Sequence, residues 1–240
     1  MGLSAGQLAA ALAAVCVGAT IQGSIGFGMN LIAVPVIAVL DPTALPASLV
    51  LAGLPLSALM VRREHHAIDR RGVAWILLGR VPGTLLGAWI VTAASPGTLS
   101  VVLGVTVLTA VLMSLRARPI SITSSTSAVA GFASGAMGTA AAIGGPPLAL
   151  LYQHRDGETM RSTLAASFLL GTTLSVATLT VAGELAWRHV LIALALTPSV
   201  AVGVALSSRL KAFLDSNWLR PSVLALAAAA GVLAMLKGLL

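Results

Sequence analysis

The stretch Gln22–Pro35, QGSIGFGMNLIAVP, decides how this chain folds. It lies inside a long apolar run, yet it contains Gly23, Gly26 and Gly28 and ends in a proline. The apolar flanks predict a membrane segment, whereas the glycines and the proline predict that its helix is interrupted. As one helix, the whole run 3–40 would be about 57 Å long, well over the hydrocarbon core of about 30 Å. We therefore expect a helical hairpin that is broken at these glycines.

A second stretch of the same kind lies in the other half of the chain. Residues Gly135–Pro147 have the sequence GAMGTAAAIGGPP, and a shift of 112 residues places Gly23 on Gly135 and Pro35 on Pro147. Two broken apolar helices at matching positions of two halves are the pattern that indicates a transporter binding site. The alternative interpretation is that the glycines only let helices pack closely.

The composition indicates a polytopic α-helical membrane protein. The 240 residues are 58% hydrophobic and 9% charged, whereas soluble domains are about 25% charged. The net charge of +7 comes from basic residues in short loops, so it indicates membrane topology and no nucleic-acid partner. Cys16 is the only cysteine, which excludes an internal disulfide and a thiolate metal cluster. We expect no metal and no cofactor.

The apolar runs divide into two repeats of one membrane domain. The first repeat, residues 1–118, contains a broken hairpin and three spans, at 3–40, 43–61, 73–93 and 98–115. The second repeat, residues 119–240, contains the same four parts, at 126–153, 162–182, 190–206 and 221–239. A chain of such spans is a multi-pass membrane protein.

Positive charge predicts the orientation of these spans. The loop 62–72 is rich in arginine, so we place it in the cytoplasm. Alternation of the spans then puts the polar loops His154–Arg161 and Ser207–Arg220 on the same side, together with Arg116–Arg118. The two hairpins must then enter from opposite faces. The predicted fold is an all-α polytopic membrane protein of two inverted repeats, each a broken, re-entrant helical hairpin followed by three transmembrane helices.

The two breaks are the candidate binding site. A helix that restarts inside a membrane presents free N–H groups and a positive dipole end, which favour an anion. Such irregular backbone is tolerated only against protein or a water-filled cavity. The residues that we expect to line one anion site are Gln22, Gly23, Ser24, Gly26, Phe27, Gly28, Asn30, Gly138, Thr139, Gly144, Gly145 and Pro146.

Arg80 and Gln22 each have two interpretations. Arg80 lies inside a span, where it either pairs with the substrate anion or extends to the membrane interface. Gln22 either lines the site or satisfies backbone groups that the break leaves free. No Asp, Glu or His lies squarely within a predicted span, so we expect potential-driven movement of an anion without an acidic relay.

These stretches, the basic loop between the second and third elements, and the chain length resemble the sulfite exporter TauE/SafE family, also called the toluene sulfonate uptake permease family. The resemblance spans nearly the whole chain. It implies a transporter, and not an enzyme, of the bacterial inner membrane that moves sulfite, sulfonates or related organic anions. Members of that family often have GGG where this chain has Gly26-Phe27-Gly28, so we expect Phe27 to shape the cavity.

Two other functions and one partner stay open at this point. An anion channel would use the same cavity without alternating access. An intramembrane serine protease would use Ser134, but Phe132 replaces the first glycine of the GxSG motif and no histidine lies in a later predicted span. Gly79, Gly83 and Gly87 recur every four residues on one helical face, which favours close helix packing or a homodimer seam.

Overall fold

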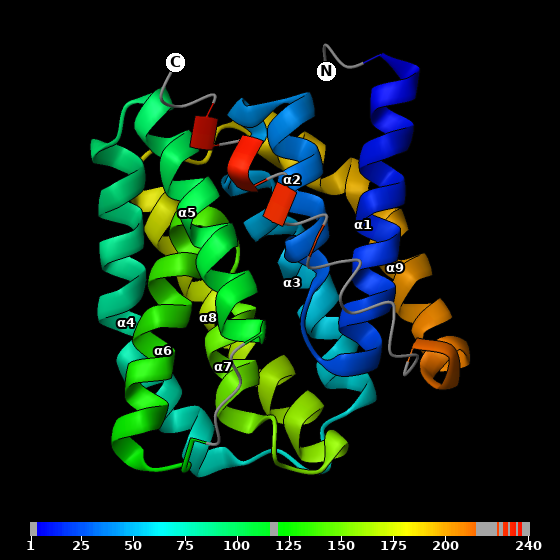
Figure 1. The fold of residues 1–240 in the computed structure, drawn as a ribbon, viewed down its shortest axis with the longest axis vertical. Coiled ribbons are helices and arrows are strands. Elements are labelled where there is room, and N and C mark those ends of the chain that lie inside the picture. Colours follow the sequence, from blue (N-terminus) through cyan, green and yellow to red (C-terminus); the bar gives the residue numbers. More distant parts are fainter. Residues whose placement is uncertain are drawn as a thin grey trace.

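The structure is a computed structural model that describes residues 4–115 and 120–214, together with short pieces between 225 and 236. The elements of these residues are all helical (Figure 1), in the following order. They are α1 (Ala5–Ile25), α2 (Met29–Leu40), the 3₁₀ turn η1 (Pro42–Ala44), α3 (Ala47–Arg63), α4 (Arg70–Ala93), α5 (Pro96–Leu115), α6 (Ser124–Ala141), α7 (Gly145–Tyr152), α8 (Gly157–Val181) and α9 (Trp187–Leu214).

Five of these helices, α1, α4, α5, α8 and α9, are long and apolar enough to cross a membrane. The prediction of an all-α polytopic membrane protein is therefore confirmed. The predicted span 221–239 and the basic residues Arg116–Arg118 lie largely or wholly outside the described residues.

Both apolar runs are interrupted by three residues that are not helical. α1 ends at Gly26, whose φ of 98° lies in the left-handed region, and α2 begins after Gly28, whose φ is 125°. These backbone angles favour glycine, which has no Cβ to clash. α6 ends at Ala142 with a φ of 59°, and α7 restarts at Gly145. The first break is shorter than predicted, because the N–H of Gly26 still bonds the Gln22 carbonyl and keeps the preceding turn helical.

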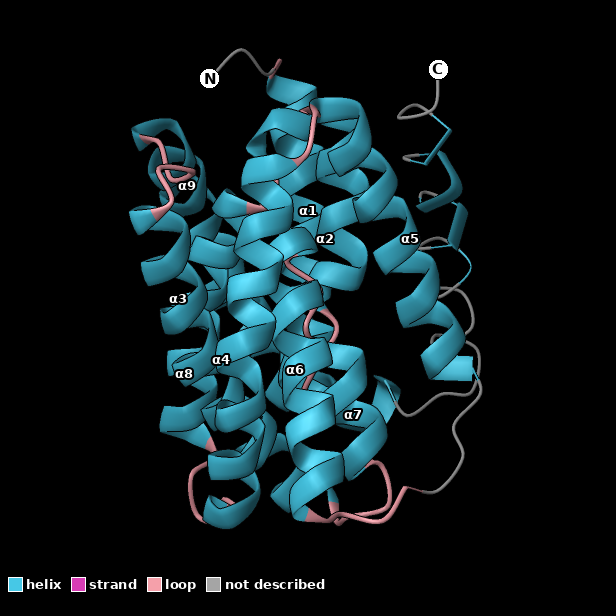
Figure 2. Cartoon of the chain, turned by 90° about the vertical axis from the view of Figure 1, so that its left-hand side faces the viewer, coloured by secondary structure: helices cyan, strands magenta, loops and turns pink. Residues whose placement is uncertain are grey.

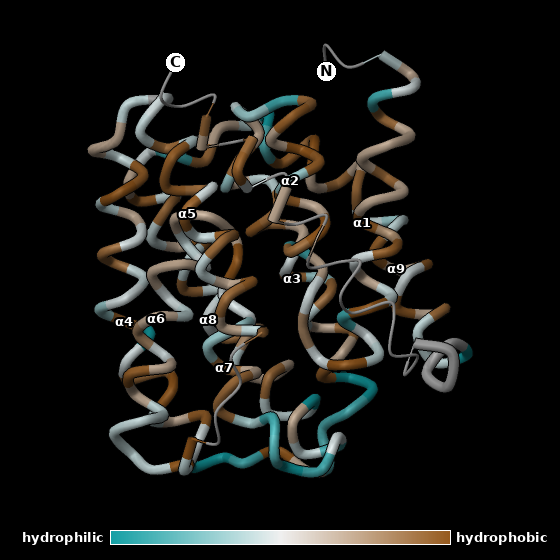
Figure 3. The backbone as a smooth tube through the Cα atoms, in the orientation of Figure 1, coloured by the Kyte–Doolittle hydropathy of each residue, from teal (hydrophilic) through white to brown (hydrophobic). Residues whose placement is uncertain are grey.

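The two hairpins occupy opposite ends of the molecule. Figure 1 shows the start of α1 and the end of α2 at one end, whereas α6 starts and α7 ends at the other. The α3–α4 and α7–α8 loops lie together at this second end, where hydrophilic residues gather (Figure 3). Figure 2 shows α1 and α2 above α6 and α7, with short loops joining the helices.

Helix packing pairs each half of the chain with the other half. α1 packs along α9, and α6 packs along α4. α3 and α8 pack on each other, and they also contact α9 and α4 respectively. Exchanging the two halves converts the α1–α9 contact into the α6–α4 contact and the α3–α9 contact into the α8–α4 contact, and it leaves the α3–α8 contact unchanged. The helices of one half are therefore held mainly by helices of the other.

Glycine brings α4 and α6 into backbone contact. A Cβ on α4 at these positions would collide with the α6 backbone, and the facing residues are Gly79 with Ala128, Gly83 with Phe132 and Gly87 with Ala136. Small residues let helices approach this closely where no water drives their association. The glycine face is thus used within the chain, and the interpretation as a homodimer seam is wrong for this face.

Several helices extend beyond the predicted spans. α3 continues to Arg63, where cations stabilise the negative end of the helix dipole. α8 begins at Gly157 because the Asp156 side chain accepts a hydrogen bond from the Thr159 N–H and caps the helix. α9 runs on to Leu214, so the predicted polar loop Ser207–Arg220 is wrong in its first part.

Gly83→Ala should destabilise the protein, because the new Cβ meets the backbone of Phe132, which has no free rotamer to move away. We expect a loss of about 1–3 kcal/mol in the free energy of unfolding, as for other overpacked sites. Titration with SDS in mixed micelles would measure it. Gly6→Ala is the matched control, because nothing lies within 4 Å of a Cβ there. Equal stability of the two variants would contradict the packing described.

Candidate functional site

The two breaks touch each other inside the helical bundle. Asn30, in the first turn of α2, donates a hydrogen bond from Nδ2 to the Ala142 carbonyl at 2.6 Å. Phe27 packs against Gly145, where an added Cβ would lie 3.1 Å from the Phe27 Cβ. Residues 112 positions apart in the sequence are thus joined directly, at the two places where the helices stop.

A small cavity of about 60 Å³ lies where the breaks meet. A single buried water needs only about 10–15 Å³ of occupied volume, so the cavity has room for a few waters or a small ligand. The predicted site residues that line it are Gln22, Phe27, Gly28, Asn30, Arg80, Gly138, Gly144, Gly145 and Pro146. Both breaks therefore contribute residues to the wall of one shared cavity.

Four predicted residues lie beside the cavity but do not line it. The Gly23 carbonyl accepts a hydrogen bond from Arg63, and the Ser24 hydroxyl donates to the carbonyls of Thr20 and Ser207. Gly26 packs against Arg161 on the opposite side of the break. The Thr139 hydroxyl bonds the Ser175 hydroxyl of α8 at 2.8 Å. These residues fix the breaks in place, and they are not part of the cavity wall.

The unbroken helices α3 and α8 complete the cavity, and we did not predict their contribution. α3 presents Leu49, Gly53 and Ser57, and α8 presents Phe168, Thr172 and Ser175. Both helices are continuous in the structure, although α3 contains Gly53 and Pro55 near its middle. The signals that could have found them are Gly53 and Pro55 of α3 and the hydroxyl side chains of both otherwise apolar spans.

Arg80 supplies a positive charge to the cavity wall. Its side chain is 3% exposed, and Nη1 donates to the Ser134 hydroxyl at 3.1 Å. The Nε atom is buried without a hydrogen-bond partner, and no carboxylate pairs with this guanidinium in the part of the chain that the structure describes. The interpretation that Arg80 extends to the membrane interface is therefore wrong. An unpaired buried cation is costly, and it is retained where a ligand or water can reach it.

Two residues hold the Arg80 side chain in position. Gly171 of α8 lies directly under the guanidinium, because an added Cβ there would overlap Nε and Cζ. Ser134 of α6 accepts from Arg80 while its own hydroxyl donates to the Gly144 carbonyl at 2.6 Å. Ser134 thus connects the cation to the second break, and its hydroxyl is committed to a structural bond.

The helix ends at the breaks offer few free N–H donors. Gln22 Oε1 accepts from the Met29 N–H at 3.0 Å, so Gln22 both lines the cavity and satisfies the first amide of α2. At the start of α7, Pro146 and Pro147 have no N–H at all. The helix ends therefore contribute their dipole fields, and Arg80 contributes the strongest donors.

Comparison with known proteins gives one match. The protein-family model described as "Sulfite exporter TauE/SafE" matches residues 10–234, which is nearly the whole chain. No curated protein and no solved structure matches the chain.

Gly171→Ala should displace the Arg80 guanidinium, because the new methyl group needs the space that Nε and Cζ occupy. We expect unfolding in SDS mixed micelles to become easier by about 1–3 kcal/mol. Gly53→Ala also adds a methyl group beside the cavity, but its nearest neighbour is Thr172 Cγ2 at 3.5 Å, an ordinary contact. It is the matched control, and an equal loss in both variants would show that Arg80 is not held in this way.

Proposed function

Because the chain belongs to the sulfite exporter TauE/SafE family, we propose that it is a membrane transporter of small anions, with sulfite and sulfonates as its substrates. The observation that carries this proposal is Arg80, a buried guanidinium without a carboxylate partner among the described residues, on the wall of the cavity between the breaks. The substrate supplies the negative charge that the site lacks.

The cavity suits a compact oxyanion. Sulfite places three oxygens around one sulfur, a volume comparable to the few waters for which the cavity has room. The planar guanidinium of Arg80 binds two oxygens of such a group side by side. Asn30 Oδ1 is buried without a partner and provides an acceptor for a protonated oxygen, as in hydrogensulfite. Phe27 limits the size of any group carried on the sulfur.

Alternating access around this cavity is the mechanism that we propose. The two hairpins act as inverted repeats, each closing the cavity from its own face of the membrane. Matching contacts at the two ends support this arrangement. At one end the Tyr152 hydroxyl donates to Asp69 at 2.8 Å, which ties α7 to the start of α4. At the other end Arg188 binds Asp41, which ties α2 to the start of α9.

The orientation that we propose places loop 62–72 in the cytoplasm and the chain in the bacterial inner membrane, and the charge of the loops supports it. An inside-negative potential then favours export of an anion by about 2.3 kcal/mol per charge at 100 mV. Export of sulfite through the cavity needs no acidic coupling residue under these conditions.

Arg80→Gln should abolish sulfite export from proteoliposomes with an imposed membrane potential. Removing one member of a desolvated charge pair costs about 2–5 kcal/mol, which corresponds to a loss of at least about thirtyfold in sulfite affinity. Arg80→Lys should keep part of the activity, because it keeps the charge and loses the planar fork. Arg155→Gln removes an exposed arginine and is the control. Export by Arg80→Gln at the wild-type rate would refute the proposed site.

The proposed orientation predicts which loops an external reagent reaches. In a Cys16→Ser background, cysteine at Ser95 or Glu184 should react with an impermeant thiol reagent added to intact cells. Cysteine at His66, an exposed residue of the α3–α4 loop, should react only after the membrane is opened. Protection of Ser95→Cys and Glu184→Cys in intact cells, with labelling of His66→Cys, would invert the orientation.

A further inference from the structure

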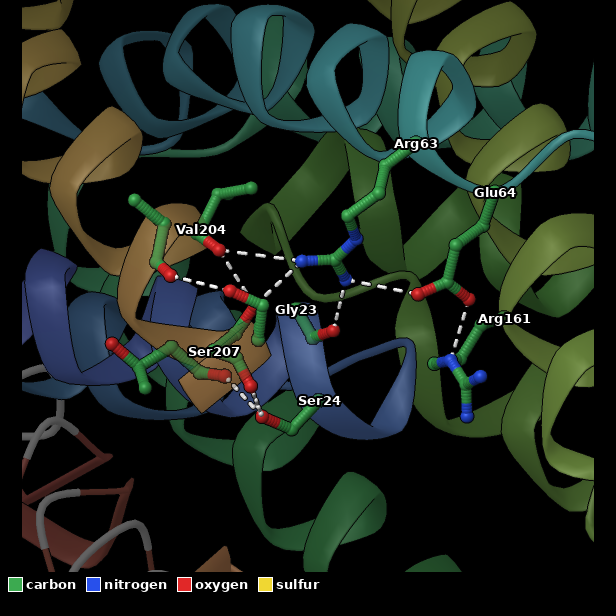
Figure 4. A network of polar contacts seen from close by, with 10 residues as sticks. Gly23, Ser24, Arg63, Glu64, Arg161, Val204 and Ser207 are labelled. Carbon is green, nitrogen blue, oxygen red and sulfur yellow. Dashed lines mark hydrogen bonds and ion pairs between the residues drawn. The ribbon is translucent and has the colours of Figure 1, made fainter. Parts of the chain in front are cut away.

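Two arginines and one glutamate meet beside the first break (Figure 4), on the side that faces the α3–α4 and α7–α8 loops. We call this side of the break the loop end. Arg63 and Glu64 lie at the end of α3, and Arg161 lies in the second turn of α8. Arg63 Nη2 is 3.0 Å from Glu64 Oε1, and Arg161 Nε is 2.5 Å from Glu64 Oε2. Each carboxylate oxygen therefore rests on a different guanidinium, and the glutamate side chain is only 9% exposed.

This cluster shares the first break with the cavity. On one side, Gln22, Phe27 and Gly28 line the cavity. On the other side, Arg63 donates to the Gly23 carbonyl, and Arg161 packs against Gly26. A single turn of backbone thus separates the proposed anion site, which has the one cation Arg80, from a pair of further cations.

Arg63 is fixed by more than the carboxylate, whereas Arg161 binds Glu64 through Nε and packs the stem of its side chain against Gly26. Arg63 Nη1 donates to the Ser207 hydroxyl at 2.7 Å and to the Val204 carbonyl at 3.3 Å, both on α9. The side chains of Arg63 and Arg161 are 26% and 19% exposed, so water reaches them from the loop end. Removal of the carboxylate would leave the Arg63 guanidinium held by α9 and by the Gly23 carbonyl, with the Arg161 guanidinium beside the vacated position.

We propose that Arg63 and Arg161 form a second binding site for the transported oxyanion, and that Glu64 occupies it in this structure as a tethered anion. A carboxylate and a sulfur oxyanion offer guanidinium groups similar charged oxygens, so one can replace the other. The transported anion exchanges with Glu64 as it passes between the cavity and the loop end. The inference rests on the proposed function for the identity of the anion.

Because Glu64 is tethered beside the second site and competes for it, this site binds a free anion weakly. Weak binding suits a site on a transport path. A group held by a short link competes at an effective concentration of about a millimolar or more. A free anion must exceed that concentration to displace Glu64, and the carboxylate then displaces the anion in turn. Neither anion is held long enough to stop transport.

Calorimetric titration of the purified full-length protein with sodium sulfite tests the second site directly. Arg80→Gln removes the cavity site, so this variant should bind no sulfite. Adding Glu64→Gln removes the negative charge that occupies the arginine pair and should restore binding, at least about tenfold tighter than the detection limit set by Arg80→Gln. Adding Arg161→Gln as well should abolish it again. Glu158→Gln, which removes an exposed glutamate of α8, is the control and should restore nothing.

The result that overturns the inference is a double variant, Glu64→Gln with Arg80→Gln, that binds no more sulfite than Arg80→Gln alone. If Glu64→Gln is not monodisperse, Glu64→Asp decides in its place, because the shorter side chain cannot bridge both arginines and should give intermediate affinity. Competition by added phosphatidylglycerol would assign the arginine pair to a lipid headgroup and would also overturn it.

If the proposed function itself is wrong, the sulfite titration gives a different result from the one that overturns the second site. If Arg80→Gln binds sulfite as the wild type does, the cavity site is wrong. The second site is then judged by comparing Glu64→Gln with the wild type. It predicts one additional sulfite per chain in Glu64→Gln, which Arg161→Gln removes.

Discussion

A helix that stops inside hydrocarbon leaves amides and carbonyls that no solvent can satisfy. This chain stops two helices inside its helical bundle, and the breaks and their neighbours supply each other's partners. Asn30 of one break donates to the Ala142 carbonyl of the other. Gln22 accepts from the first amide of α2, and the Ser134 hydroxyl donates to the Gly144 carbonyl. The contact between the breaks is therefore the condition under which either of them can exist at membrane depth, and the cavity is the space that this contact leaves.

The need for partners inside the bundle also explains the position of the Arg80 guanidinium. A guanidinium inside a bundle needs partners, and the described structure gives Arg80 only Ser134, through Nη1. Gly171 leaves the space that the side chain requires, and the α4 glycines bring its helix onto α6, which carries Ser134. The small residues of α4 and α8 thus act on electrostatics as well as on packing, because they determine where the positive charge points.

The sequence predicts those features whose cause lies in residues close together along the chain. Clustered glycines at matching positions of two halves and an arginine inside an apolar run are unusual, so both breaks and Arg80 stand out as candidates. Glu64 does not, because it lies in the segment RREHHAIDRR, whose composition is typical of a solvated loop. Its burial depends on Arg161, which lies 97 residues later. The cavity walls on α3 and α8 are equally non-local, and the extension of α9 past Ser207 goes with its contacts to α1 and Arg63.

The exchanged packing of the helices also determines the order in which the protein can assemble. α1 packs on α9, which is the last helix that the structure describes in full, and α4 packs on α6. At synthesis rates of about 5–20 residues per second, α1 spends on the order of ten seconds in the membrane before α9 exists. Throughout that interval the first break lacks the partner that α9 supplies, the Ser207 carbonyl that accepts from Ser24. A newly made first half is consequently an unfinished membrane protein, exposed to quality-control proteases until its complement arrives.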